Sequence, residues 1–234
     1  MLSHLVGLLF PDRCPACDAL TFHPGLCARC ATSLYPTAPA CPVCALPQLA
    51  TVVCSRCRLH PPPWETVRAP YRYGGELATA IRRFKWGGAG GAGRPELARP
   101  LGHLLAPAVA DAPADVIVPV PLHADRVRER GFSQALALAL AARRVARLGA
   151  PLEPGLLERR RATSVQAGLG RTRRAENVAG AFAVPEPARV AGKRVLLVDD
   201  VIATVATAAA CARALRAGGA ADVAVAELAR RCFG

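Results

Sequence analysis

Beyond about residue 66, apolar and polar positions follow one another in blocks that predict strands and helices in turn. Apolar runs that predict strands occupy residues 67–73, 115–122, 195–198 and 222–228. Longer periodic patterns that predict helices occupy residues 77–86, 95–110 and 134–148, with a further helix ending near residue 217. Strands that alternate with helices favour an α/β domain with a parallel sheet flanked by helices. In such sheets, ligands bind beyond the carboxyl ends of the strands.

Several residues predict where these elements begin and end. Pro95 suits the first turn of a helix, and Ser133 suits the N-cap position of the next one. That second helix is predicted to end at Gly149, and the last helix at Gly218 and Gly219. Residues 87–93, which read GGAGGAG, predict a flexible stretch that cannot pack.

The first sixty residues have a different pattern, with few large apolar side chains and many cysteines. Eight of the ten cysteines form four CxxC pairs, and the spacing C-x2-C-x9-C-x2-C occurs twice: Cys14, Cys17, Cys27 and Cys30, then Cys41, Cys44, Cys54 and Cys57. Each CxxC turn directs two sulfurs at one point, and two turns complete the tetrahedral thiolate shell that zinc prefers. The sequence therefore predicts two structural zinc ions in a double zinc ribbon, with folding that depends on metal.

The assignment of cysteines to metals stays open at this stage. Sequential pairing, the first four cysteines and then the last four, is the simplest arrangement, but a crossed one satisfies the same spacing. His23 and His60 could also replace a cysteine as ligands. Residues 61–63 are three prolines, which predict a stiff linker and divide the chain into a ribbon module, residues 1–63, and an α/β domain, residues 64–234.

The N-terminal segment lacks the features of a secretory signal. The apolar run at residues 5–10 is short, has no basic residue ahead of it and is not followed by a small-residue cleavage site. The most apolar long stretch, residues 135–142, is followed by Arg143 and Arg144 and is too short to span a membrane. We expect a cytoplasmic protein, in which reducing conditions favour zinc thiolates over disulfides.

Most of the formal charge of +13, namely +11, lies in the α/β domain. Two of the 30 basic residues are lysines, which leaves 28 arginines. Twelve of these lie within residues 123–174, whereas residues 1–63 hold four arginines against two aspartates. Two four-thiolate zinc centres would make the ribbon module slightly acidic, so affinity for nucleic acid is expected mainly in the α/β domain. The alternative is a solvated arginine surface that reflects a GC-rich genome.

Two adjacent carboxylates, Asp199 and Asp200, follow the apolar strand at residues 195–198. Adjacent carboxylates next to a buried strand repel each other unless a cation or hydroxyl groups meet them. A sugar diol or a magnesium ion would suit this position. The alternative is a capped and solvated turn that precedes a helix.

Three segments resemble a known family. VLLVDDVIATVAT, residues 195–207, resembles the phosphoribosyl pyrophosphate (PRPP) signature of type I phosphoribosyltransferases. VPVPLHADRVRERGFSQ, residues 118–134, and RATSVQAGLGRTRRAENVAGAF, residues 161–182, are similar to segments of the ComF/GntX family, which also has an N-terminal double zinc ribbon. The resemblance covers nearly the whole chain and implies a type I phosphoribosyltransferase-like fold for the α/β domain.

The resemblance implies roles for individual residues. Asp199 and Asp200 would contact the ribose hydroxyls of magnesium PRPP, and residues 118–123 would form the loop on the pyrophosphate side. The loop that holds the 5′-phosphate would consist of Ala203, Thr204, Val205, Ala206 and Thr207. The candidates for binding pyrophosphate or a DNA backbone are Arg126, Arg128, Arg130, Arg161 and Arg174.

This sequence departs from the family pattern at two positions of the phosphate loop. Ala203 replaces a threonine and removes one hydroxyl, and Val205 replaces a glycine that lets the backbone approach the phosphate closely. We expect PRPP binding to be weakened by these changes but not abolished.

The resemblance also implies a role in natural transformation, in which the protein handles incoming single-stranded DNA at the inner face of the membrane, with the DNA-uptake machinery as a further partner. Phe84, Trp86 and Phe132 could stack on bases. Two alternatives stay open: an active phosphoribosyltransferase with an unidentified acceptor, and a PRPP-sensing scaffold that does not catalyse. No residue of the sequence is placed as a general base, so no catalytic residue is assigned.

Overall fold

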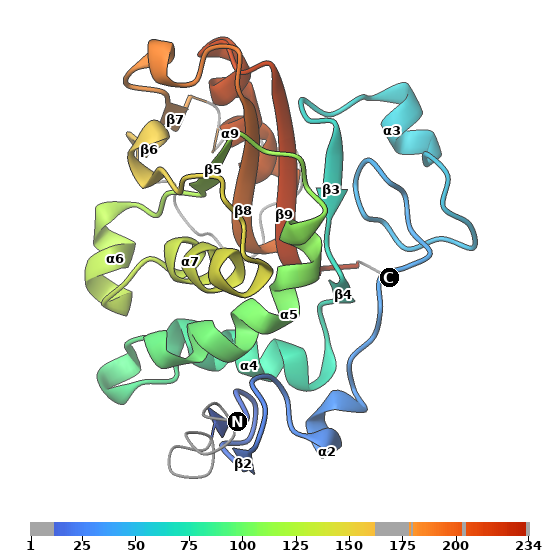
Figure 1. Ribbon diagram of the computed structural model, residues 1–234, viewed down its shortest axis with the longest axis vertical. Coiled ribbons are helices and arrows are strands. Elements are labelled where there is room, and N and C mark those ends of the chain that lie inside the picture. The colour runs from blue at the N-terminus through green and yellow to red at the C-terminus, as the bar shows by residue number, and fades with distance from the viewer. Residues whose placement is uncertain (1–11, 162–177, 179, 203–204, 233–234) are drawn as a thin grey trace.

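A parallel sheet forms the centre of the α/β domain (Figure 1). The computed structural model describes residues 12–161, 178, 180–202 and 205–232. The strands run in the order β3-β9-β8-β5, and every pair is parallel. Their bounds are Thr66–Arg68 for β3, Asp222–Arg230 for β9, Arg194–Ile202 for β8 and Val116–Pro119 for β5. The predicted parallel α/β fold is confirmed.

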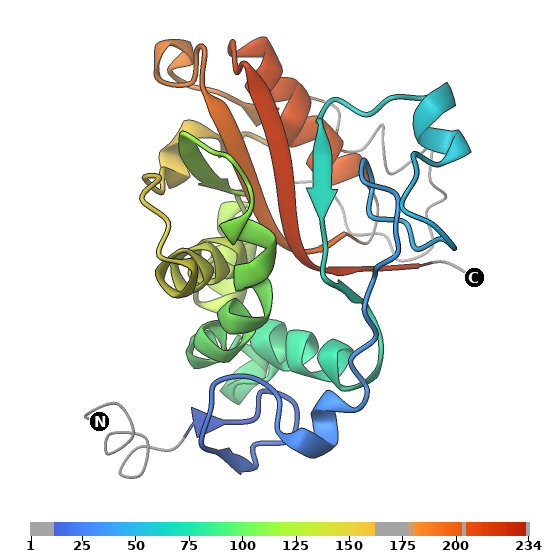
Figure 2. The same ribbon diagram turned by 45° about the vertical axis from the view of Figure 1, so that its right-hand side comes forward.

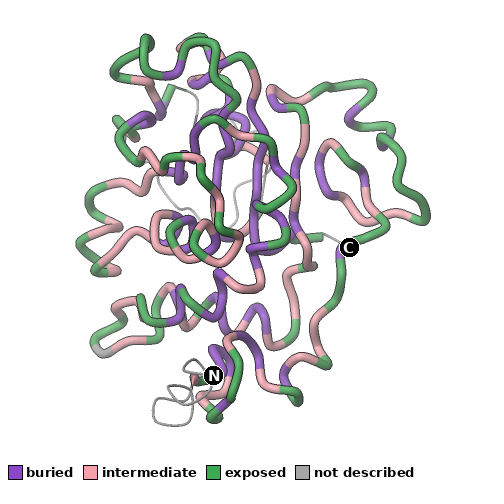
Figure 3. Tube along the Cα trace, in the orientation of Figure 1, coloured by how far each residue is buried: buried purple, intermediate pink, exposed green. Residues whose placement is uncertain are grey.

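Helices cover both faces of this sheet. On one face lie α4 (Gly75–Trp86), α5 (Ala98–Ala110) and α7 (Gln134–Ala146), and on the other lies α9 (Val205–Ala217) (Figures 1 and 2). Successive side chains of β8 alternate between these layers, because a strand directs neighbouring residues to opposite faces. Val195 and Leu197 belong to the core on the α9 face, and Leu196 and Val198 to the core beneath α4, α5 and α7. The central strands are buried along most of their length (Figure 3).

Smaller elements surround this framework. Their bounds are Asp12–Arg13 (β1), Leu20–Thr21 (β2), Ala28–Ala31 (α2), Ser55–Leu59 (α3), Tyr71–Arg72 (β4), Ala124–Arg130 (α6), Glu158–Arg159 (β6) and Phe182–Ala183 (β7). Short 3-10 turns occupy Ala89–Gly91, Pro95–Leu97, Pro154–Leu156 and Pro187–Arg189. Within the described ranges, every helix is too short or too polar to traverse a bilayer.

Most predicted boundaries agree with the structure, but some differ. The strand expected at residues 195–198 continues to Ile202 as β8. The strand expected at residues 67–73 is divided into β3 and β4, and Pro70, which cannot donate a ladder hydrogen bond, lies between them. Ser133 caps α7 as predicted, because its hydroxyl accepts a hydrogen bond from the Leu136 amide at 3.4 Å. The helix nevertheless ends before Gly149, since Arg147 takes the left-handed conformation at the C-cap with φ of 54°.

The prediction that residues 87–93 cannot pack is wrong at the end of that segment. A Cβ atom on Gly93 would lie 2.7 Å from the carbonyl oxygen of Phe84 and would collide with the ring of Phe132. The rings of Phe84 and Phe132 pack edge to face with their centroids 5.1 Å apart. Glycine therefore allows the segment after α4 to lie directly against the start of the α7 region.

Candidate functional site

The eight paired cysteines form two separate clusters of four. Cys14, Cys17, Cys27 and Cys30 make up one cluster and Cys41, Cys44, Cys54 and Cys57 the other, and the sulfurs within each cluster lie within 4.8 Å of one another. The Cys17–Cys27 and Cys44–Cys54 sulfurs are each 3.8 Å apart. A tetrahedron with metal–sulfur bonds of about 2.3 Å has edges of about 3.8 Å, so each cluster fits one zinc ion. Pairing is sequential, and neither His23 nor His60 belongs to a cluster.

Backbone hydrogen bonds favour the thiolate form of one cysteine in each cluster. A hydrogen bond from the Ala19 backbone contributes most to lowering the pKa of Cys17 to about 6. Burial opposes the same change at Cys41, but backbone N–H groups of Cys54, Cys44 and Val43 lower the pKa of that thiol to about 7. Thiolates are the form that binds zinc, so these contacts support metal binding at neutral pH.

The first ribbon, residues 12–31, packs on the helical face formed by α4 and α5. Cys14, Leu26 and Cys30 are buried in the same core as Leu77 of α4 and Leu101 of α5. This ribbon is thus part of the main hydrophobic core rather than a separate appendage.

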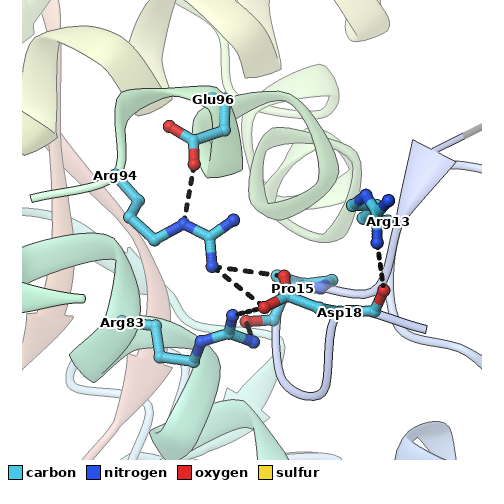
Figure 4. A network of polar contacts seen from close by, with 6 residues as sticks. All are labelled: Arg13, Pro15, Asp18, Arg83, Arg94 and Glu96. Atoms are coloured by element: carbon cyan, nitrogen blue, oxygen red, sulfur yellow. Dashed lines mark hydrogen bonds and ion pairs between the residues drawn. The ribbon is translucent and has the colours of Figure 1, made fainter. Parts of the chain in front are cut away.

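Asp18 anchors the first ribbon to the same helical face (Figure 4). Arg83 of α4 donates to the Asp18 carboxylate and, at 3.1 Å, to the carbonyl of Pro15. Arg94 reaches both carboxylate oxygens of Asp18 at 3.2 Å and holds Glu96 at 2.7 Å. Partial burial would raise the pKa of Asp18, but hydrogen bonds from Arg94 and Arg83 lower it. Two arginines far along the chain therefore hold one ribbon loop in place.

The second ribbon, residues 39–58, packs on the opposite face of the sheet. The indole N–H of Trp64 donates to the Val43 carbonyl at 2.7 Å, and the hydroxyl of Thr66 donates to the Pro42 carbonyl at 2.8 Å. Ala45 and Trp64 are buried in the core that includes α9. The two ribbons therefore join different layers of the α/β domain. The division of the chain at residue 63 stays a prediction.

Asp199 and Asp200 lie toward the carboxyl end of β8, within the strand rather than after it. Lys85 of α4 binds Asp200, with its Nζ 2.8 Å from Oδ1, and both side chains are largely buried. Burial, and then the adjacent Asp200 carboxylate, raise the pKa of Asp199 to about 7. Asp200 therefore has a cationic partner, whereas Asp199 has a pKa near neutral pH.

Glu227 is a third carboxyl group at the carboxyl-terminal edge of the sheet and was not predicted. Together with Asp199 and Asp200 it forms what we call the carboxylate edge. It pairs with Asp199 across the parallel β8–β9 register and is 2% exposed. Burial and the Asp199 and Asp200 charges raise its pKa well above the usual value. Its Oε2 has no hydrogen-bond partner among the residues that the structure describes. The sequence signal was available, because Glu227 is the acidic residue within the apolar strand VAVAELA and carboxyl ends of parallel strands share an edge.

Three of the candidate arginines, Arg126, Arg128 and Arg130, have different surroundings. Arg130 lies with its guanidinium 4.8 Å from the ring centre of Trp86, and its partial burial lowers its pKa, an effect that the charge of Asp200 opposes. Arg126 and Arg128 lie on α6 and form ion pairs with Glu129 and Asp125 on the same helix. All three therefore lie on α6, but Arg130, its last residue, is the one whose charge interacts with Asp200 and Asp199.

The remaining site candidates are described only in part. Arg161 is exposed, whereas Arg174, Ala203 and Thr204 lie outside the described residues. Val205, Ala206 and Thr207 form the first turn of α9. Val205 is partly buried against the α9-face core, so the valine is accommodated in helical backbone. The expectation that Val205 weakens phosphate binding stays a prediction.

The fold and the cysteine centres define an α/β protein with a double zinc ribbon, and residues 5–58 match the double zinc ribbon domain family. Over 229 residues the chain is 33% identical to DNA utilization protein YhgH of Salmonella typhimurium, covering 93% of this chain and 96% of that protein. It is 31% identical to competence protein F of Haemophilus influenzae over 215 residues, or 88% and 90% of the two chains. The chain belongs to the family of these proteins, the ComF/GntX family.

Two solved structures have local similarity to this chain. One is described as the allosteric regulatory enzyme of purine biosynthesis, with 28% identity, a TM-score of 0.38, and coverage of 58% of this chain and 26% of that one. The other is glutamine PRPP amidotransferase from B. subtilis, with 29% identity, a TM-score of 0.35, and coverage of 55% and 25%. The chain thus spans about a quarter of the length of each solved chain.

Proposed function

We propose that this chain is a cytoplasmic ComF-like protein whose α/β domain binds magnesium PRPP and handles incoming single-stranded DNA in natural transformation. The observation that carries the PRPP half is the carboxylate edge, where Asp199 and Asp200 precede the α9 amino terminus by a few residues. Carboxylates can accept hydrogen bonds from the ribose hydroxyls, and the amino end of a helix favours binding of the 5′-phosphate. Family membership supports the DNA half.

The surroundings of the carboxylate edge also suit a polyphosphate ligand. Lys85 pairs with Asp200, and Arg130 interacts electrostatically with Asp200 and Asp199 from further away. Both cations lie over the ring of Trp86, at 5.9 and 4.8 Å from its centre. Among the described residues, the groups able to hold a metal on their own are the two cysteine clusters. We therefore propose magnesium only together with PRPP, whose pyrophosphate would supply further oxygen ligands.

PRPP affinity should fall at least tenfold in Asp199→Asn, because the neutral amide loses a charge-assisted hydrogen bond to the sugar worth about 1.5–3 kcal/mol. Val205→Gly should bind PRPP more tightly than wild type, because glycine lets the backbone of the phosphate loop approach the 5′-phosphate more closely. The measurement is calorimetric titration of the zinc-loaded protein with PRPP, with and without magnesium. Asp111→Asn, at an exposed position beyond α5, is the matched control. Equal affinity in wild type and Asp199→Asn would contradict the proposal.

Single-stranded DNA should bind with a steep salt dependence, since phosphate contacts release counterions. Arg128→Ala should lower the slope of log affinity against log salt by about 1, and Trp86→Ala should lose a stacking platform worth about 1–3 kcal/mol. Trp86 is 44% exposed and is available to a base. Fluorescence anisotropy with a labelled oligothymidylate measures both effects. Arg189→Ala, distant in the fold and paired with Glu153 and Glu186, is the control.

Two results would separate this proposal from its alternatives. Asp199→Asn should leave the affinity for single-stranded DNA unchanged, because basic side chains bind the DNA backbone. An affinity that hardly changes between low and physiological salt would contradict the electrostatic interface. Release of pyrophosphate from PRPP with an added acceptor would instead favour an active transferase, whereas PRPP binding without DNA binding would favour a sensing scaffold.

A further inference from the structure

A cavity of about 200 Å³ lies where the second ribbon, α9 and the end of β9 meet. Its lining residues come from residues 44–64 and residues 205–230, so it exists only because the ribbon packs on the domain. Val205, Ala209 and Arg213 are four residues apart and face it along one side of α9. The rest of its apolar lining consists of Leu46, Trp64 and the prolines at positions 61–63. The three prolines, expected as a linker, are thus part of a cavity wall.

The cavity is lined by basic side chains from both parts of the chain. Arg56 and His60 come from the second ribbon segment, and Arg213 and Arg230 come from α9 and β9. No aspartate or glutamate is among the described residues that line it. Cys44 and Cys57 also border it, and a four-thiolate zinc centre carries −2, so three arginines leave a net +1 even with neutral histidine.

Arg230 provides a second and independent indication. The residue is 6% exposed and lines the cavity, and its Nε has no hydrogen-bond partner among the described residues. Arg216 on α9 is different, because it binds both Glu65 and Asp222. Glu227 lies three residues before Arg230 on β9, and its charge interacts with that of Arg230 over a distance, yet no ion pair joins them within the described part of the chain. A buried guanidinium N–H without a hydrogen-bond acceptor is unfavourable, so this site favours an anion that can accept from it.

We propose that this cavity binds a phosphate ester, with Arg56 of the ribbon and Arg213 of α9 holding its oxygens above Arg230. Arginine forks match phosphate oxygens better than other basic side chains do. The volume is below the roughly 300 Å³ of typical small-molecule pockets, so it takes a phosphate and part of a sugar, with the base outside. The phosphate could belong to a free nucleotide or to one unit of a DNA strand. Asp199, Asp200 and Glu227 do not line this cavity, and Val205 is the one residue that it shares with the proposed 5′-phosphate loop, so binding here does not require PRPP.

The test uses the full-length zinc-loaded protein and two probes. One probe is dAMP, a free phosphate ester, and the other is a fluorescently labelled oligothymidylate of twelve nucleotides. Arg56→Ala and Arg213→Ala should each weaken binding about tenfold, the loss expected for one charge-assisted contact. Arg58→Ala is the matched control, since Arg58 is exposed on α3 two residues from Arg56 and does not line the cavity. Zinc content and circular dichroism establish that each variant is folded.

Each outcome is informative. If Arg56→Ala and Arg213→Ala bind both probes more weakly and Arg58→Ala does not, the cavity is a site for any phosphate ester. Loss of the oligonucleotide alone identifies a strand phosphate, and loss of dAMP alone identifies a free nucleotide. If wild type binds no DNA, the proposed DNA function fails while dAMP still tests the cavity. Equal affinities in the three arginine variants, or no binding of either probe to wild type, would overturn the proposal.

Discussion

Protein that lacks zinc in the first ribbon will lose the folded structure of α4 and α5 as well as that of the ribbon. Cys14 and Cys30 are 0% and 2% exposed and share one core with Leu77 and Leu101. Structural zinc contributes an apparent free energy of about 10–16 kcal/mol in zinc-finger peptides, which is comparable to the whole stability of a domain. Cys30→Ser should therefore bind one zinc equivalent fewer and show increased amide exchange in α4.

The corresponding control is Cys232→Ser, because Cys232 is an exposed thiol outside both clusters. This variant should retain two zinc equivalents and the wild-type melting temperature. Cys57→Ser should instead increase exchange in the second ribbon and near β3, because that ribbon packs on the other face. A Cys30→Ser protein in which α4 exchanges as slowly as in wild type would show that the domain core does not depend on the first ribbon.

Trp64→Ala should lower the free energy of unfolding by about 3–5 kcal/mol, the usual loss when a buried tryptophan is truncated. Trp64 is 4% exposed, packs in the α9-face core and donates its indole hydrogen to the Val43 carbonyl at 2.7 Å. The substitution removes the main side chain that joins the second ribbon to the sheet. Urea unfolding followed by circular dichroism gives the change in free energy.

Trp64→Phe separates packing from hydrogen bonding at the same position. The smaller aromatic ring keeps most of the apolar contact but leaves the Val43 carbonyl without its donor, so we expect a loss of about 1–3 kcal/mol. Thr66→Val removes the neighbouring hydrogen bond to Pro42, which is exposed, and should lose less. If Trp64→Ala unfolds at the wild-type urea concentration, the second ribbon does not stabilise the α/β domain through this contact.

Local chemistry made the cysteine centres and much of the α/β fold predictable from the sequence. The repeated CxxC spacing is a property of short turns, so it can be recognised without knowing on which layers the ribbons pack. The apolar runs of β5, β8 and β9 mark strands that are buried on both faces, and such strands need no information from distant residues to be recognised. The adjacency of Asp199 and Asp200 in the sequence identified the carboxylate edge before the structure placed Lys85 against it.

Features that depend on contacts between distant residues were not available from the sequence. Asp18 meets Arg83 and Arg94 across 65 and 76 positions, and Lys85 meets Asp200 across 115. No local pattern encodes such a pair, because any of the many arginines satisfies the composition equally well. For the same reason, the excess of basic residues in the α/β domain did not reveal that Arg56 of the second ribbon shares a cavity with Arg213.

By itself, then, the sequence determined the two zinc centres, the parallel sheet and the carboxylate pair, because turn geometry and burial pattern are read over a few neighbouring residues. Only the tertiary structure decided that the ribbons pack on opposite faces of the sheet, and that Glu227 completes the carboxylate edge. It also decided that Arg230 is buried beside the second ribbon. Those features arise from packing between layers, where the free energy depends on which distant surfaces exclude water together.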